Sequence, residues 1–129
     1  MTKLSILIPS LESRKELLAN LIAEIKRQDK DNSVEVLTAV DKGECTIGRK
    51  RNALLQSASG LYVSFIDDDD RMSSNYIQLL MQGIDMGVDA CSLRGVLTWD
   101  GDRPELFEHS IKYVEWRTND TGNIKYERY

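Results

Sequence analysis

Short apolar runs alternate with helix-like segments through most of this 129-residue sequence, and the alternation limits the folds it can adopt. The runs have the length of β-strands and lie at residues 4–8, 34–40, 61–66 and 90–97. The segments between them that are typical of helices lie at residues 13–28, 46–60 and 73–87. Because strand and helix alternate, we predict an α/β domain whose mostly parallel sheet carries helices on its faces.

Capping residues and glycines set the expected helix boundaries. The expected starts are Ser13 with Glu16 in a capping box, then Thr46 or Ile47, then Ser73 or Ser74. Gln28 is the expected end of the first helix, and Gly60 and Gly87 are expected to stop the second and the third.

The pattern changes after Trp99. Residues 111–117 and 124–129 resemble two strands, and residues 119–122 (Asn-Asp-Thr-Gly) between them are typical of a turn. We therefore predict a β-hairpin in the last part of the chain. The length of 129 residues fits one domain, 1–129, in which this hairpin follows the alternating region.

Composition narrows the class of protein further. The formal net charge of −4 does not suggest a nucleic-acid partner. No apolar run reaches the length of a membrane-spanning helix. Cys45 and Cys91 lie far apart, without the spacing of a zinc site, which fits two free thiols in a reducing compartment. We therefore expect a cytoplasmic protein with no membrane segment and no nucleic-acid partner.

Polar residues directly follow the first three predicted strands. They are residues 9–12 (Pro-Ser-Leu-Glu), 41–43 (Asp-Lys-Gly) and 67–70 (four aspartates). In an open parallel sheet, ligands bind beyond the carboxyl ends of the strands, which share one edge. We therefore expect the functional site at this edge.

The run from Asp67 to Asp70 is the most informative of these clusters. Adjacent carboxylates repel each other, and a divalent cation offsets that repulsion most strongly. Mn²⁺ and Mg²⁺ are commonly held by one or two carboxylates and by substrate phosphates. Asp67 and Asp69 can share a face and are the expected metal ligands, while Asp68 would point to the sheet or to a basic side chain. A solvated acidic loop is the alternative.

A basic triplet, Arg49, Lys50 and Arg51, lies near the expected start of the second helix. Free backbone N–H groups and the helix dipole favour anions there. We expect one or two of these side chains to reach a diphosphate, with a solvated helix face as the alternative. Neither a P-loop nor a dinucleotide-binding glycine motif is present. No catalytic triad can be built on His109, the only histidine.

Three segments, in this order, share a pattern with one known family. Residues 4–10 (Leu-Ser-Ile-Leu-Ile-Pro-Ser) are similar to its first strand. Residues 48–53 (Gly-Arg-Lys-Arg-Asn-Ala) resemble its G-x-x-x-A-R-N-x-G signature in compressed form. Residues 60–70 (Gly-Leu-Tyr-Val-Ser-Phe-Ile-Asp-Asp-Asp-Asp) resemble its G-x-Y-I-x-F-L-D-x-D-D segment, the most specific match. Over residues 3–97 the chain thus resembles a family 2 GT-A glycosyltransferase.

The resemblance implies a Rossmann-like GT-A fold and a role for each matching residue. Residues 3–97 would form the nucleotide-sugar-binding core, and residues 98–129 would be an acceptor-side hairpin region. The implied nucleotide-sugar-binding residues are Pro9, Ser10, Leu11 and Glu12 near the nucleobase, Asp41 at the base edge, Gly48, Arg51 and Asn52 near the ribose and diphosphate, and Asp67 and Asp68. Asp69, with Asp67, would bind Mn²⁺ or Mg²⁺. The family implies a UDP-sugar donor most often, and the acceptor stays unknown.

Departures from the family pattern concern base recognition and catalysis. Lys42 stands where the family usually has a second acidic residue after its second strand. The family's catalytic base and metal-binding histidine have no clear counterpart after the tetrad, as in a minimal or C-terminally truncated form. The candidate bases are Asp100, Asp102 and Glu108. We therefore expect donor binding and chemistry to separate in this chain, and an open strand edge that could favour a homo-oligomer.

Three hypotheses for the function follow. The first is a metal-dependent glycosyltransferase, in which the cation offsets charge on the departing diphosphate. The second is a UDP-sugar-binding module with little or no transfer. The third is a Mg²⁺-dependent phosphotransferase or phosphatase, although the residue after the tetrad, Arg71, is not the hydroxyl residue that one such class requires.

Overall fold

The chain forms two compact units, Met1–Val88 and Asp89–Tyr129. A computed structural model describes residues 1–110, 117–118 and 124–127. The first unit contains a parallel sheet, and the second contains a separate sheet.

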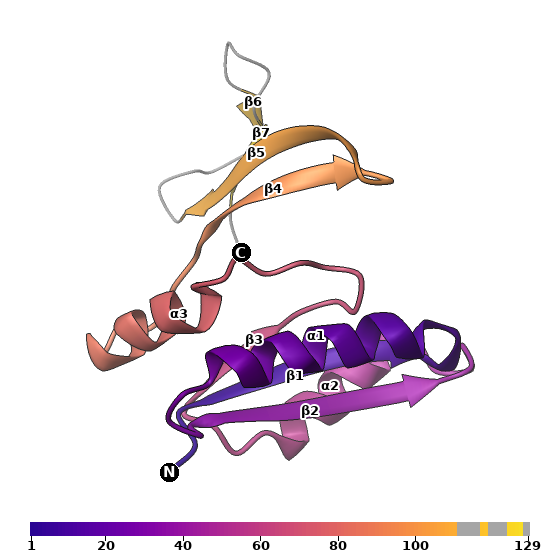
Figure 1. Ribbon diagram of the computed structural model, residues 1–129, viewed down its shortest axis with the longest axis horizontal. Coiled ribbons are helices and arrows are strands. Elements are labelled where there is room, and N and C mark those ends of the chain that lie inside the picture. Colours follow the sequence, from indigo (N-terminus) through magenta and orange to yellow (C-terminus); the bar gives the residue numbers. More distant parts are fainter. Residues whose placement is uncertain (111–116, 119–123, 128–129) are drawn as a thin grey trace. The chain divides into compact units, whose positions relative to one another are not determined.

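The first unit alternates strands and helices. Its elements are β1 (Leu4–Leu11), the 3-10 helix η1 (Glu12–Arg14), α1 (Lys15–Gln28), β2 (Val34–Asp41), α2 (Ile47–Ser57), β3 (Tyr62–Phe65) and α3 (Tyr76–Asp85). The strands pair in parallel in the order β2-β1-β3. Figure 1 shows α1 and α2 on opposite faces of this sheet. The prediction of an α/β fold with a parallel sheet flanked by helices is confirmed.

The central strand β1 carries the core of this unit. Every residue from Leu4 to Ser10 is buried. Strand β2 pairs with β1 along its whole length, β3 pairs with its first half, and helices cover both faces of the sheet. The buried helix residues are Leu21 and Ile25 of α1, Lys50 and Leu54 of α2, and Ile77, Leu80 and Gly83 of α3. Among the described residues, no helix is both long and apolar enough to cross a membrane.

Strand β1 continues past Pro9, where the sequence predicted its end, to Leu11. Proline has no N–H group and is tolerated in a strand where no ladder hydrogen bond is required. Because β3 pairs with β1 only from Leu4 to Leu7, β2 is the only described strand that pairs with β1 at Pro9. The longer strand carries Ser10 to the carboxyl edge of the sheet.

Some expected helix boundaries are confirmed and others are wrong. Thr46 caps α2 by accepting a hydrogen bond from the Arg49 N–H group, and Gly87, at φ +71°, follows the end of α3 as predicted. The capping box at Ser13 is wrong, because the chain leaves β1 through η1 and α1 begins only at Lys15. Ser73 and Ser74 do not cap α3, whose N-cap is Asn75.

Gly60 has a packing role and does not end α2, which ends at Ser57. A Cβ atom on Gly60 would lie 2.6 Å from the backbone nitrogen of Ser5 and 2.7 Å from its Oγ. The Gly60 N–H group donates to Ser5 Oγ, which donates in turn to Glu35. Hydrogen bonds from Ser5 and Ser59 hold the pKa of Glu35 below its usual range. These hydrogen bonds hold the residues just before β3 against β1 and β2.

The second unit is built around an antiparallel hairpin. Its strands are β4 (Arg94–Trp99), β5 (Asp102–Ser110), β6 (Arg117–Thr118) and β7 (Ile124–Glu127), in the order β4-β5-β7-β6. Asp100 and Gly101 join β4 to β5, with φ of +52° and +84°. Positive φ at both central residues is typical of the tight turns that close hairpins.

Two predictions for this part of the chain have different outcomes. The strand expected at 90–97 begins at Arg94 and pairs antiparallel with β5 instead of extending the parallel sheet, because the tight turn returns the chain at once. The C-terminal hairpin is confirmed where β6 and β7 pair antiparallel. Residues 111–116, 119–123 and 128–129 of that prediction lie outside the described residues.

Gly60→Ala should destabilise the first unit by roughly 1–3 kcal/mol, because the added methyl group meets the backbone and hydroxyl of Ser5. Gly48→Ala is the matched control, since a Cβ atom there would have nothing within 4 Å. Because alanine is also more favourable than glycine inside a helix, Gly48→Ala should not lower the free energy of unfolding. Chemical denaturation measures both variants, and parental stability of Gly60→Ala would contradict the packing role.

Candidate functional site

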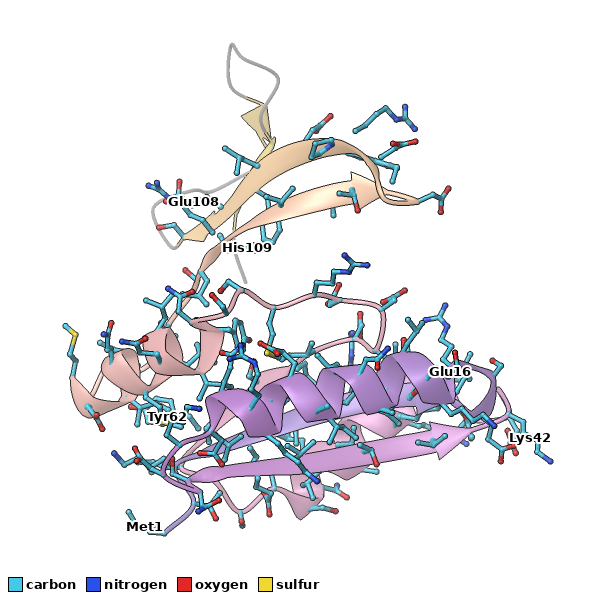
Figure 2. The ribbon with its side chains drawn as sticks, viewed as in Figure 1. Met1, Glu16, Lys42, Tyr62, Glu108 and His109 are labelled. Atoms are coloured by element: carbon cyan, nitrogen blue, oxygen red, sulfur yellow. The ribbon has the colours of Figure 1, made fainter. Side chains whose placement is uncertain are left out.

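Polar side chains gather at the carboxyl edge of the parallel sheet. β1 ends at Leu11, β2 ends at Asp41, and the four aspartates follow β3 after Ile66. Figure 2 shows Lys42, just after β2, at the opposite end of the first unit from Met1. The contacts below join side chains from β1, η1, β2, α2 and the segment after β3. The structure thus brings together clusters that lie far apart in the sequence.

Lys50 joins α2 to the ends of β1 and β2. This lysine is 7% exposed, and its Nζ donates to the backbone oxygen of Ser10 at 2.7 Å and forms an ion pair with Asp41. The hydrogen bond from Lys50 lowers the pKa of Asp41. Asp41 also accepts hydrogen bonds from the N–H groups of Gly43 and Cys45. Asp41, predicted to bind a nucleobase, is therefore engaged in holding α2 and the loop before it.

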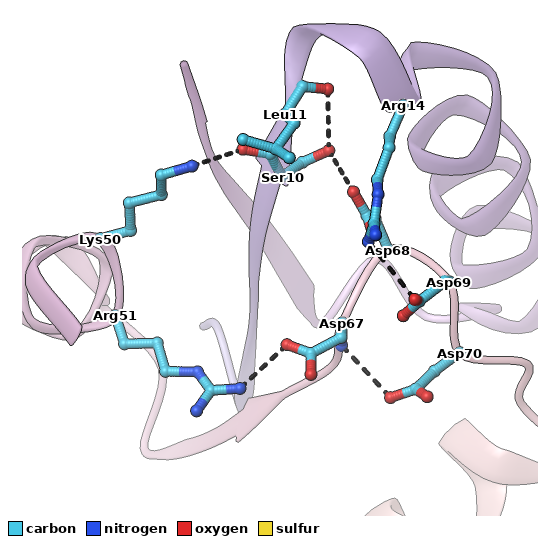
Figure 3. Close-up of polar contacts among 9 residues, drawn as sticks. All are labelled: Ser10, Leu11, Arg14, Lys50, Arg51, Asp67, Asp68, Asp69 and Asp70. Atoms are coloured by element: carbon cyan, nitrogen blue, oxygen red, sulfur yellow. Dashed lines mark hydrogen bonds and ion pairs between the residues drawn. The ribbon is translucent and has the colours of Figure 1, made fainter. Parts of the chain in front are cut away.

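Asp68 is the buried member of the tetrad. Ser10 Oγ donates to its Oδ2 at 2.6 Å, and Arg14 Nη1 donates to its Oδ1 at 2.9 Å (Figure 3). The same arginine nitrogen lies 3.3 Å from Oδ2 of Asp69. Asp68 was expected to point to the sheet or to a basic side chain, and it contacts both a strand residue and an arginine.

Arg51 contacts the first aspartate of the tetrad. Its Nη2 lies 2.9 Å from Oδ1 of Asp67, and its Cζ lies 5.7 Å from the centre of the Phe65 ring. In the described part of the chain, Arg51 Nε is a buried nitrogen without a hydrogen-bond partner. The Arg51 and Asp67 side chains are each 42% exposed, so solvent screens their attraction and a ligand can reach them.

Asp67 and Asp70 close a tight turn after β3. The Asp70 N–H group donates to the Asp67 carbonyl oxygen at 3.0 Å, and the Asp67 N–H group lies 3.4 Å from Asp70 Oδ2. Partial desolvation raises the pKa of Asp70, and the neighbouring carboxylates add to the rise. Asp68 is buried, Asp67 is half-buried, and Asp69 and Asp70 are exposed, so the four carboxylates differ in their access to solvent.

The remaining predicted binding residues surround these contacts. Pro9 is buried in β1, and Leu11 is half-buried at its end. Glu12 is exposed in η1, and Gly48 and Asn52 are exposed on α2. Glu12 Oε2 lies 4.0 Å from Lys42 Nζ. Within the described part of the chain, no contact of these five residues assigns them a role.

The candidate bases belong to the second unit. Asp100 lies in the turn between β4 and β5, and Asp102 begins β5. Glu108 Oε1 lies 3.6 Å from Arg94 Nε. The ring of His109 packs edge-on against the ring of Phe107, with 5.3 Å between the ring centres. Contacts within this unit do not single out one of the three carboxylates as a base.

Two residues of this edge, Arg14 and Lys50, carry no distinctive signal in the sequence. Lys50 stands out only as a member of the basic triplet, and Arg14 belongs to no motif. The position of Arg14 in the fold could indicate it as a site residue. The chain that follows a parallel strand starts at the carboxyl edge of the sheet, and Arg14 is three residues beyond the end of β1.

The described residues contain no group of three or more His, Cys, Asp or Glu side chains arranged to hold a metal ion. No family model, curated protein or solved structure matches this chain. A function for the chain is therefore inferred from its motifs and from the geometry of this edge.

Asp41→Ala should destabilise the protein by about 3 kcal/mol, because it leaves the ammonium group of Lys50 buried without its counter-charge. The double variant Asp41→Ala/Lys50→Met should lose less stability than Asp41→Ala alone, since it removes the buried charge as well. Urea denaturation of the parent, both single variants and the double variant measures this coupling. If the stability lost by the double variant equals the sum of the losses of the two single variants, the ion pair does not hold α2.

The stabilising effect of Asp41 should also depend on pH. Its folded-state pKa lies below the unfolded value of about 3.9, so the effect is fully present well above that value. The effect is lost as pH falls through the folded pKa. Asp41→Asn should therefore be less stable than the parent at pH 7, and the difference should shrink below about pH 4. A constant difference from pH 7 to pH 2 would contradict the assignment.

Proposed function

We propose that this chain binds a UDP-sugar at the carboxyl edge of its parallel sheet and transfers the sugar, as a metal-dependent glycosyltransferase of the GT-A type. The observation that carries the proposal is the set of paired cations and carboxylates from η1, β2, α2 and the end of β3 along this one edge. A sugar diphosphate offers anionic oxygens to the arginines and oxygen ligands to a cation. The motifs at residues 4–10, 48–53 and 60–70 favour a nucleotide-sugar over other phosphates.

The carboxylates of this edge fit a divalent cation that is completed by a substrate. Asp69 is 55% exposed and Asp67 is 42% exposed, so both can offer oxygen atoms to a ligand. Mg²⁺ and Mn²⁺ are usually held by one or two carboxylates, with other positions left to phosphates and water. Asp67 and Asp69 would therefore hold the cation. When bound, it would stabilise negative charge on the departing diphosphate.

Arg51 and the first turn of α2 would orient the diphosphate. A phosphate oxygen beside Arg51 would give its buried Nε the acceptor that the described residues do not supply. Gly48 lies in the first turn of α2, where a Cβ atom would meet nothing within 4 Å, so an anion has room to approach the backbone.

A UDP-sugar-binding module with little transfer is the second candidate. The donor-side residues belong to Met1–Val88, whereas Asp100, Asp102 and Glu108 belong to Asp89–Tyr129. Inverting transfer requires a carboxylate that takes the proton of the acceptor hydroxyl. Incubation with UDP-sugars, Mn²⁺ and a panel of acceptors distinguishes the two. Glycosylated product favours the transferase, and binding without transfer favours the module.

Mn²⁺ should strengthen UDP binding about tenfold, a difference of about 1.4 kcal/mol, because Asp69 would hold a cation that offsets the charge of the diphosphate. Asp69→Asn should remove most of this gain. Asp85→Asn is the matched control, since Asp85 pairs with Lys3 in an exposed ion pair outside the tetrad. Titration calorimetry in Mn²⁺ and in chelator measures each affinity. Equal UDP affinity of the parent in both buffers would refute the role of the cation.

A further inference from the structure

Arg14 shares one guanidinium nitrogen between two aspartates of the tetrad. Its Nη1 lies 2.9 Å from Asp68 Oδ1 and 3.3 Å from Asp69 Oδ2. The two contacts differ in their access to solvent, because the Asp68 side chain is 3% exposed and that of Asp69 is 55% exposed. The inner contact is therefore protected, and the outer contact is open to exchange with ions from solution.

Ser10 secures the inner contact. Its hydroxyl donates to Asp68 Oδ2, so both oxygens of the buried carboxylate are engaged. Arg14 can then stay anchored to Asp68 whether or not it also contacts Asp69. The Arg14 side chain is 44% exposed, which leaves its guanidinium room to turn away from the outer carboxylate.

We propose that Arg14 is a tethered counter-ion, which neutralises Asp69 when no divalent cation is bound and gives up this contact when one binds. The inference rests on the proposed function, because it takes Asp69 as a ligand of the cation. A cation at Asp69 and the guanidinium of Arg14 carry like charges and repel each other at short range. Arg14 therefore weakens binding of the free cation. The diphosphate supplies negative charge that offsets the positive charges of the cation and of Arg14. Cation binding therefore depends on the nucleotide.

The test compares Mn²⁺ binding by the parent and by Arg14→Gln, with Mn²⁺ alone as the probe. Electron paramagnetic resonance measures free Mn²⁺ at low ionic strength, where repulsion between exposed charges is least screened. Arg14→Gln should bind Mn²⁺ about tenfold more tightly than the parent, because the like charge is removed. Arg14→Lys retains the charge and should stay close to the parent.

Arg27→Gln is the matched control. Arg27 lies in α1 and pairs with Glu24. The variant therefore removes one positive charge without removing a contact of the tetrad. Its Mn²⁺ affinity should stay close to that of the parent. A gain equal to that of Arg14→Gln would mean that net charge alone governs binding, and would overturn the inference.

A second pair of variants serves if Arg14→Gln does not fold, since that variant removes a partner of the buried Asp68. Asp68→Asn/Arg14→Gln removes both charges of the inner contact. It should bind Mn²⁺ more tightly than Asp68→Asn alone, in which the arginine remains to occupy Asp69. Equal or weaker binding by the double variant would overturn the inference.

The outcomes separate this inference from the proposed function. Tight Mn²⁺ binding by Arg14→Gln, with no Mn²⁺ binding by the parent even in the presence of UDP, would support Arg14 as a counter-ion that excludes the cation. It would refute both the release of Arg14 by the nucleotide and the metal-dependent function. Mn²⁺-dependent UDP binding by the parent, with no gain in Arg14→Gln, would support the function and overturn the inference. No binding by the parent or by any variant would overturn both.

Discussion

The buried ion pair between Lys50 and Asp41 determines how the carboxyl edge of the sheet is built. Lys50 reaches the backbone of β1 and the last residue of β2 at the same time. A buried ammonium group is tolerated only when its charge and hydrogen bonds are satisfied, so α2 has little freedom to rotate or slide. Because Arg51 is the next residue, its position beside β3 follows from this constraint.

Contacts with two arginines give the first three aspartates of the tetrad different chemical environments. Asp67 is paired with Arg51 at a half-exposed position, and Asp68 is buried between Ser10 and Arg14. Asp69 is exposed beside that arginine. A run of identical residues therefore supplies one structural carboxylate and others that remain accessible. The tight turn after β3 is responsible, since it sends successive side chains in different directions.

The strand–helix alternation and the gathering of the polar clusters at one edge of the sheet could be predicted from the sequence, because the first depends on local patterns and the second on a general property of parallel sheets. Residues 4–8, 34–40 and 61–66 correspond to β1, β2 and β3. The partners of the charged side chains could not be predicted, because Arg14 meets Asp68 only through the tertiary fold. The β4–β5 hairpin had a local signal in Asp100-Gly101, but the apolar run at 90–97 equally fitted a further parallel strand.

The two sheets differ in how far apart along the chain their paired residues lie. Leu4 pairs with Val34 and Tyr62, whereas Trp99 pairs with Asp102 across a two-residue turn. Pairing of distant segments is slow, because the entropy cost of closing the loop comes before the contacts that repay it. During synthesis from the N-terminus, β1 therefore has no second neighbour until residues 62–65 have emerged from the ribosome. In that interval its apolar residues are exposed to aggregation, and a chaperone that shields them would act before β3 appears.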